Sequence, residues 1–284
     1  MWLLVAVGWV GLTGVSGSAQ GAAAKAPAAV KQADAEMDGA EALIGRALFL
    51  RGFYSENDLS YDASGKVQGT PKTGDWTLAG MDVLQVQRRG AQVIELDGVR
   101  VAIRYNPDSH QFERHAQNDE KMKVRVADAG SAAGFEAALE VIFAQGIDPE
   151  LQHAMPAMWQ HYFNPGLGWP QDALTGQTIY ALNGLPNQAK DVTPPSVLHK
   201  QDSKLTGEAE KDRVSGVLQL RMVVDAQGVP QRIEVARPLG YGLDERAVEA
   251  IARWRFTPAM RGGQPVAAAM LLNYSFEVAA PPRR

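Results

Sequence analysis

The chain contains no cysteine among its 284 residues. This absence excludes thiolate zinc sites, disulfide frameworks and catalysis by a thiol. The formal net charge is -4 and no block of basic residues occurs, so the sequence lacks the basic stripe typical of nucleic-acid-binding proteins. Neither a phosphate-binding P-loop nor the Gly-x-Ser-x-Gly elbow of a hydrolase is present. We therefore expect a protein that is not an enzyme and that has no nucleic-acid partner.

Residues 2–15 form an uncharged apolar run that ends in small residues, with Gly17 and Ala19 suitably spaced for cleavage before Gln20. This pattern is typical of a secretory signal peptide. The run is shorter than the roughly 20 apolar residues of a spanning helix, and no Lys or Arg precedes it. We expect residues 1–19 to be a signal peptide or a short anchor, and the chain to be exported.

Composition divides the remaining chain into segments. Residues 20–40 are rich in alanine and predict a flexible linker, with a frayed helix as the alternative. Residues 41–163 carry the signals of a first domain. Residues 164–195 are rich in proline and glycine, which predicts a linker that packs in places. Residues 196–278 form a second domain, and residues 279–284 a tail.

The first domain is predicted to be α+β and mostly antiparallel, with two helices. Residues 99–105 alternate between apolar and other side chains, as in a half-buried strand. Asp97-Gly98, directly before them, predicts a two-residue hairpin turn. Apolar residues recur at helical spacing from Phe135 to Phe143. A second helix is expected over residues 151–163, disturbed by Pro156.

The second domain has a clearer pattern. Residues 217–224 and 231–237 alternate and flank a turn at 225–228, which predicts a hairpin. Residues 243–254 have apolar side chains at a helical period, and residues 270–278 alternate strictly. The order predicts a three-stranded antiparallel sheet packed on one helix.

Several short runs in this region resemble the TonB C-terminal domain family, over about residues 194–278. They are Gly216-Val217-Leu218, Val223-Val224-Asp225, Leu239-Gly240-Tyr241-Gly242-Leu243-Asp244, Ala247-Val248-Glu249-Ala250 and Gly263-Gln264-Pro265-Val266. The most specific run follows the helix and comprises Arg253, Trp254, Arg255, Phe256, Thr257, Pro258 and Ala259. For the first domain, residues 41–163, the sequence shows no resemblance to a known family.

The resemblance implies a periplasmic module that binds an extended segment of an outer-membrane TonB-dependent transporter, or of another envelope protein, as an added strand. It places the binding edge at residues 266–276. The peptide contacts it implies are Val266, Ala268, Met270, Leu271, Asn273 and Ser275, together with Leu205 and Thr206. Leu205-Thr206 stands where the family often has a Tyr-Pro or Tyr-Thr pair. No cofactor and no metal is implied.

Two further expectations concern partners. Inner-membrane motor proteins are partners only if residues 1–19 remain as an anchor, and this run lacks the polar residue expected of a motor-coupled anchor. A folded domain also replaces the long proline-rich spacer of a transducer. The alternative function is structural, in which the same sheet edge pairs with a second copy to form a homodimer.

Other candidate sites have a simpler explanation as surface or core residues. A metal or acid–base site is suggested by His110, Glu113, His115 and Asp119. Turn-like residues at 106–109 and 118–119 favour a solvated loop there instead. His153 and His161 lie two helical turns apart with a proline between them, and His199 stands alone. For these three histidines we also favour a structural or surface role over a functional site. Arg253 and Arg255 could clamp a carboxylate, but we favour solvated charges beside a buried tryptophan.

Overall fold

The computed structural model describes residues 34–182 and 184–278. The predicted signal peptide or anchor, most of the predicted linker 20–40 and the tail 279–284 lie outside the described residues. Helices and strands are both present, which confirms the α+β class. No helix in the described part of the chain has the length and apolar character needed to cross a membrane.

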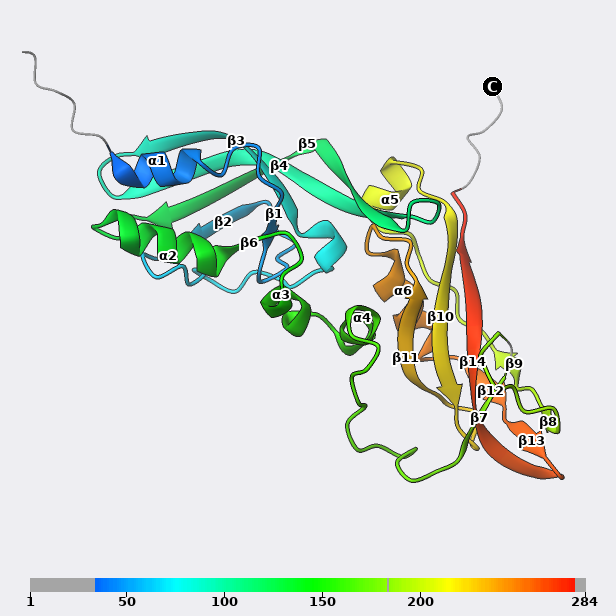
Figure 1. Cartoon of the computed structure of the whole chain (residues 1–284). Coiled ribbons are helices and arrows are strands. Elements are labelled where there is room, and N and C mark those ends of the chain that lie inside the picture. Colours follow the sequence, from blue (N-terminus) through cyan, green and yellow to red (C-terminus); the bar gives the residue numbers. More distant parts are fainter. Residues whose placement is uncertain (1–33, 183, 279–284) are drawn as a thin grey trace, which may run out of the picture. The chain divides into compact units, whose positions relative to one another are not determined.

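The first sheet has six strands in the order β2-β5-β4-β3-β1-β6 and is antiparallel except for the β2–β5 pair (Figure 1). Its elements and their neighbours are α1 (Ala35–Glu41), β1 (Leu48–Leu50), β2 (Asp58–Tyr61), the 3-10 helix η1 (Trp76–Leu78), β3 (Gly80–Arg89), β4 (Val93–Asn106), β5 (Gln111–Ala127), α2 (Ala132–Ile142) and β6 (Phe143–Gln145). Part of the predicted linker is thus helical, since α1 begins at Ala35.

The predicted turn at Asp97-Gly98 is wrong, because β4 runs straight through it. Gly98 faces β3 beside a register irregularity between Val83 and Gln85. A Cβ atom at Gly98 would collide with the backbone oxygen of Asp82. The close approach of two strands therefore explains the glycine at this position. In the sequence alone, such a glycine looks the same as the glycine of a hairpin turn.

The helix predicted over residues 151–163 forms as two short helices, α3 (Pro149–Ala154) and α4 (Ala157–Phe163). Asp148 caps α3 by accepting a hydrogen bond from the Leu151 N–H at 2.7 Å. Met155, which precedes Pro156, has the extended conformation that proline imposes on the residue before it. The predicted disturbance at Pro156 is confirmed.

The second sheet contains the predicted hairpin and last strand in the order β11-β10-β14. Short strands extend this sheet, and two others form a separate pair. The bounds are β7 (Ile179–Ala181), β8 (Val192–Thr193), β9 (Ser196–His199), α5 (Gly207–Lys211), β10 (Gly216–Val224), β11 (Pro230–Arg237), α6 (Leu243–Ile251), β12 (Arg255–Thr257), β13 (Ala259–Arg261) and β14 (Gln264–Phe276). The predicted ordered linker therefore contributes β7 and β8.

One hydrophobic cluster contains buried residues from both sheets and from α4 and α6. At this junction the Tyr241 N–H donates to Ile103 O at 2.9 Å, and the Tyr105 N–H donates to Leu239 O at 3.1 Å. Gly240 has a φ of +90°, and a Cβ there would collide with Ile103 O. Backbone contact of this kind requires glycine. The division into domains at residues 41–163 and 196–278 stays a prediction.

Three carboxyl groups lie at the junction: Asp244 and Glu245 are buried, and Asp75 is half-buried. Burial raises the pKa of Asp244 to about 7, although two backbone N–H groups donate to it. Burial also raises the pKa of Asp75 to about 6, and it raises the pKa of Glu245 well above its usual range. Glu245 accepts a hydrogen bond from Trp159 Nε1 at 2.5 Å. The folded chain therefore holds protons that the unfolded chain releases at lower pH.

We expect the free energy of unfolding to fall by a few kcal/mol as the pH rises from about 4 to about 7. Unfolded carboxyl groups lose their protons near pH 4, whereas Asp75 and Asp244 keep theirs until about pH 6 to 7, so the unfolded state binds fewer protons in this window. Urea unfolding at about pH 5 and about pH 8 measures the effect. Asp75→Asn should reduce the slope, and Asp62→Asn, whose carboxyl has a lowered pKa, should not. Equal or greater stability at the higher pH contradicts this account.

Candidate functional site

Strand β14 has one side that is only partly paired. On its first side, β14 pairs with β10 in regular register from Ala268 to Phe276. On the opposite side, β7 runs parallel to residues 267–269. From Met270 to Phe276, no strand in the described part of the chain pairs with that opposite side. We call this stretch, residues 270–276, the free edge.

The direction of the backbone groups on the free edge follows from one hydrogen bond. The Leu182 N–H donates to Ala269 O at 2.8 Å, so Ala269 points its polar backbone groups toward the β7 side. The N–H and C=O of a strand residue share one side, and the side alternates along the strand. Leu271, Asn273 and Ser275 therefore present unpaired N–H and C=O groups on the free edge.

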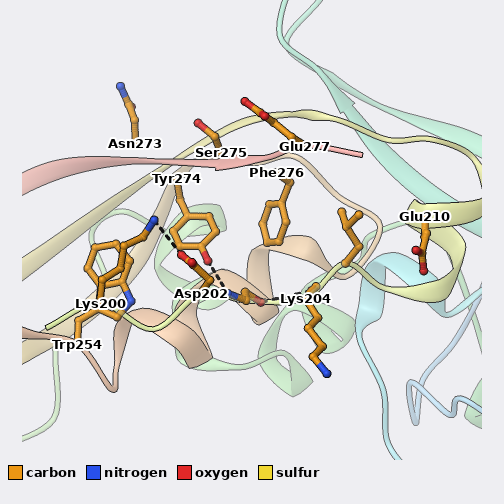
Figure 2. A pocket seen from close by; sticks show the side chains of 12 residues that line it. Lys200, Asp202, Lys204, Glu210, Trp254, Asn273, Tyr274, Ser275, Phe276 and Glu277 are labelled. Carbon is orange, nitrogen blue, oxygen red and sulfur yellow. Dashed lines mark hydrogen bonds and ion pairs between the residues drawn. The ribbon is translucent and has the colours of Figure 1, made fainter. Parts of the chain in front are cut away.

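A groove of ≈ 750 Å³ lies along the second half of the free edge (Figure 2). Its lining combines buried aromatic residues with exposed charged side chains. Its lining residues are Lys200, Asp202, Ser203, Lys204, Leu205, Glu210, Trp254, Asn273, Tyr274, Ser275, Phe276 and Glu277. The groove is mixed in charge, because lysine and acidic side chains both reach it.

The wall of the groove opposite β14 is the segment 200–205, which is tied down at two points. Trp254 Nε1 donates to Gln201 O at 2.8 Å, and the Ser203 N–H donates to Tyr274 Oη at 2.7 Å. Lys200 lies over the Trp254 ring, with its Nζ 5.7 Å from the centroid. These contacts hold the wall in place without a ligand, so little ordering entropy remains to be lost on binding.

The Arg-Trp-Arg-Phe run, residues 253–256, supports the groove through the packing of Trp254. Trp254 is buried, and its ring centroid lies 6.0 Å from those of Phe256 and Tyr274. Arg253 and Arg255 are exposed, and neither forms an ion pair within the described residues. Pro258 lies between β12 and β13. Of the two interpretations of the arginines, solvated charges beside a buried tryptophan fit this geometry.

The structure brings only some of the predicted contact residues together. Leu205, Asn273 and Ser275 all line the groove. Leu271 is half-buried and Met270 is buried, on opposite faces of the sheet. These five residues lie on the free edge or beside it.

The other three predicted contacts lie elsewhere. Val266 pairs with Ala259 of β13, and Ala268 lies between β10 and β7. Thr206 caps α5: its hydroxyl accepts from the Ala209 N–H at 3.2 Å and donates to Tyr241 O at 2.7 Å. Peptide contacts at these residues stay a prediction.

The histidine-containing candidates do not form one site, although His115 Nε2 lies 3.8 Å from Glu113 Oε2. His110, Glu113, His115 and Asp119 follow one another along the β4–β5 hairpin, and no group of side chains suited to a metal occurs in the described ranges. The solvated loop expected at 118–119 is wrong, because β5 continues through it. Its physical reason is long-range: residues 118–120 lie in an irregularity of the β4–β5 pairing beside Val99 and Arg100, and Asp119 forms an ion pair with Lys211 of α5.

The remaining histidines differ in their surroundings. His161 is buried, and its imidazole ring stacks on the indole ring of Trp169, with the two ring centroids 3.8 Å apart. His153 lies in the last turn of α3, and His199 is exposed in β9. The groove wall at residues 200–204 and the pairing of β7 with β14 are not predicted from the sequence, because both depend on contacts between residues distant in sequence. The only local signal for β7 is the Ile179-Tyr180 pair within the linker.

Fold and edge together define a small α+β module with an exposed strand edge beside a preformed groove. Residues 207–278 match the family model described as Gram-negative bacterial TonB protein C-terminal. The resemblance seen in the sequence is thereby confirmed for these residues, which are about a quarter of the chain. The comparison with curated proteins finds no match.

Among solved structures, the chain is similar to the solution NMR structure of the Pseudomonas aeruginosa TonB CTD. The identity is 21%, and the match covers 34% of this chain and 95% of that one, with a TM-score of 0.26.

Proposed function

We propose that residues 196–278 bind an extended peptide by adding it as a strand to the free edge of β14. The observation that carries the proposal is the row of outward backbone groups at Leu271, Asn273 and Ser275, next to a groove that is already formed. An exposed strand edge is a template for pairing with another chain. The family match of residues 207–278 supports the same role.

The affinity expected from such an edge is modest. Each backbone hydrogen bond contributes only about 0.5–1.5 kcal/mol net, so three edge residues supply a few kcal/mol at most. The rest must come from peptide side chains. Alternate side chains of an added strand would point to the face where Tyr274 and Phe276 lie, and would enter the groove near Leu205. Side-chain contacts in the groove would therefore set selectivity.

The partner we propose is an outer-membrane TonB-dependent transporter or another envelope protein, and the location is the periplasm. Both follow from the family match and the predicted export signal. In this proposal the module performs no chemistry. Motor proteins of the inner membrane become partners only if residues 1–19 stay as an anchor.

Asn273→Pro tests the proposal. Proline removes the outward N–H at the centre of the free edge while leaving the β10 pairing intact, because that N–H points away from β10. We expect a loss of peptide affinity of about ten-fold or more, measured by calorimetry with peptides from the N-terminal segments of outer-membrane transporters.

Asn273→Ala is the matched control, because it removes the side chain and keeps the N–H. Its loss of affinity should be clearly smaller than that of Asn273→Pro, because the backbone hydrogen bond to the added strand is kept. Equal binding by the proline variant and the parent contradicts strand addition. Sedimentation addresses the alternative function: self-association that Asn273→Pro abolishes, without any peptide binding in the parent, favours a dimerisation module.

A further inference from the structure

Strand β7 occupies the stretch of β14 that directly precedes the free edge. It comes from the proline- and glycine-rich linker, far in sequence from β14, and adds to β14 as a parallel strand. Tyr180 lies opposite Ala268, and Ala181 lies opposite Ala269. The Leu182 N–H completes the pairing by donating to Ala269 O at 2.8 Å. The chain thus binds one of its own extended segments on this edge.

The large side chains in and around β7 pack over small side chains on β14. The positions it covers on β14 are three consecutive alanines, residues 267–269, which leave room for Ile179 and Tyr180. Leu174 and Leu182, on either side of β7 in sequence, are both buried in small clusters with these alanines. Beyond residue 269, the side chains of β14 become large, and β7 ends there.

Polar contacts hold the linker at several points. Arg232 binds Asp172 through two nitrogens at 2.6 Å each. Arg261 donates to Tyr180 Oη at 2.8 Å and also lies over the Tyr180 ring, 4.9 Å from its centroid. All of these charged partners are at least partly exposed, so water can replace them.

The outer side of β7 is closed. The Ala189 N–H donates to Ala181 O at 2.9 Å, on the side of β7 that faces away from β14. No further strand can pair there without removing residue 189. A peptide that adds to the free edge must therefore stop near residue 270 or replace β7.

We propose that β7 is a displaceable strap, which covers residues 267–269 of the binding edge and limits the partner to the free edge until it is replaced. This proposal rests on the proposed function. The strap is three residues long, each of them half-exposed, and its pairing is parallel, which is the weaker arrangement per residue. A partner that replaces it would carry a β-branched or aromatic pair like Ile179-Tyr180 to lie over the alanines.

A disulfide between Ala181→Cys and Ala269→Cys tests the strap in the full chain. These residues are direct partners across the β7–β14 pair, and the chain has no other cysteine. The probe is a synthetic peptide with the sequence of residues 177–184. We expect the reduced protein to bind it at least about ten-fold more tightly than the oxidised protein. The double serine variant, with and without reductant, controls for the reductant itself.

Hydrogen exchange gives a readout that needs no peptide. The Leu182 amide should exchange by local opening, well before the amides of β10, and the disulfide should slow it. Equal peptide binding by the two forms, or a Leu182 amide that exchanges only with β10, overturns the strap. If neither form binds the peptide, the strap is overturned as an exchangeable strand, whereas the proposed function at residues 270–276 is judged separately, by the transporter-derived peptides.

Discussion

Replacing Arg100 with leucine is expected to lower the free energy of unfolding by at least about 3 kcal/mol, because it removes a buried cation that satisfies several backbone oxygens. Arg100 lies in β4 and is only 3% exposed. Its guanidinium donates five hydrogen bonds, to Asn57 Oδ1 and to the carbonyl oxygens of Tyr54, Ser55, Glu56 and Leu78, at 2.5–3.2 Å. These bonds hold the segment 54–57 and the end of η1 against the first sheet.

Leucine fills much of the same space but leaves all five acceptors without their donor. Arg104→Leu is the matched control, since Arg104 is exposed on the same strand and should change stability by no more than about 0.5 kcal/mol. Arg100→Lys should fall between them, because an ammonium keeps the charge but has three donors instead of five. Urea unfolding followed by circular dichroism measures all three variants. Equal stabilities of the two leucine variants contradict this role for Arg100.

Trp254→Ala is expected to cost about 3–5 kcal/mol, the range for removing a large aromatic side chain from a core. The indole is 4% exposed and packs on Phe256 and Tyr274. It also holds the groove wall through the hydrogen bond from Nε1 to Gln201 O. The substitution should therefore destabilise the second sheet and loosen the groove together.

Trp254→Phe separates these two effects. Phenylalanine keeps most of the packing and loses the hydrogen bond to Gln201, so its cost should be clearly smaller than that of alanine. Denaturant unfolding gives the stabilities, and the exchange rate of the Ser203 amide reports on the groove wall, because that amide donates to Tyr274. An alanine variant as stable as the parent excludes Trp254 as a core residue.

The parts of the fold that the sequence predicts are those with local signals. The β10–β11 hairpin, α6 and β14 each show a clear period, and turn residues separate them. Pro156 likewise acts on its immediate neighbours. The same local reasoning fails at Asp97-Gly98, where glycine serves strand contact instead of a turn.

Arg100 shows why strand alternation was misleading in the first sheet. The pattern at residues 99–105 predicts a half-buried strand with its arginines toward water, but only Arg104 is exposed there. The segment 54–57, distant in sequence, supplies the acceptors that allow Arg100 to be buried. No local pattern records that contact.

In the candidate site, too, features with a local sequence signal are predicted, whereas features formed by long-range contacts are not. The last strand and the run around Trp254 are predicted from sequence, and Leu205, Asn273 and Ser275 do line one groove. The extent of the free edge is not predicted, because it depends on where β7 pairs. Three residues in a linker carry too little pattern to reveal that pairing.

Titration of isotope-labelled protein with transporter-derived peptides, followed by NMR at the backbone amides of β14, tests the central claim most directly. We predict the largest shift changes at the outward amides of Leu271, Asn273 and Ser275, with smaller changes at the amides that pair with β10. Shift changes confined to other surfaces, or no change between residues 270 and 276 for any peptide, would contradict strand addition at the free edge.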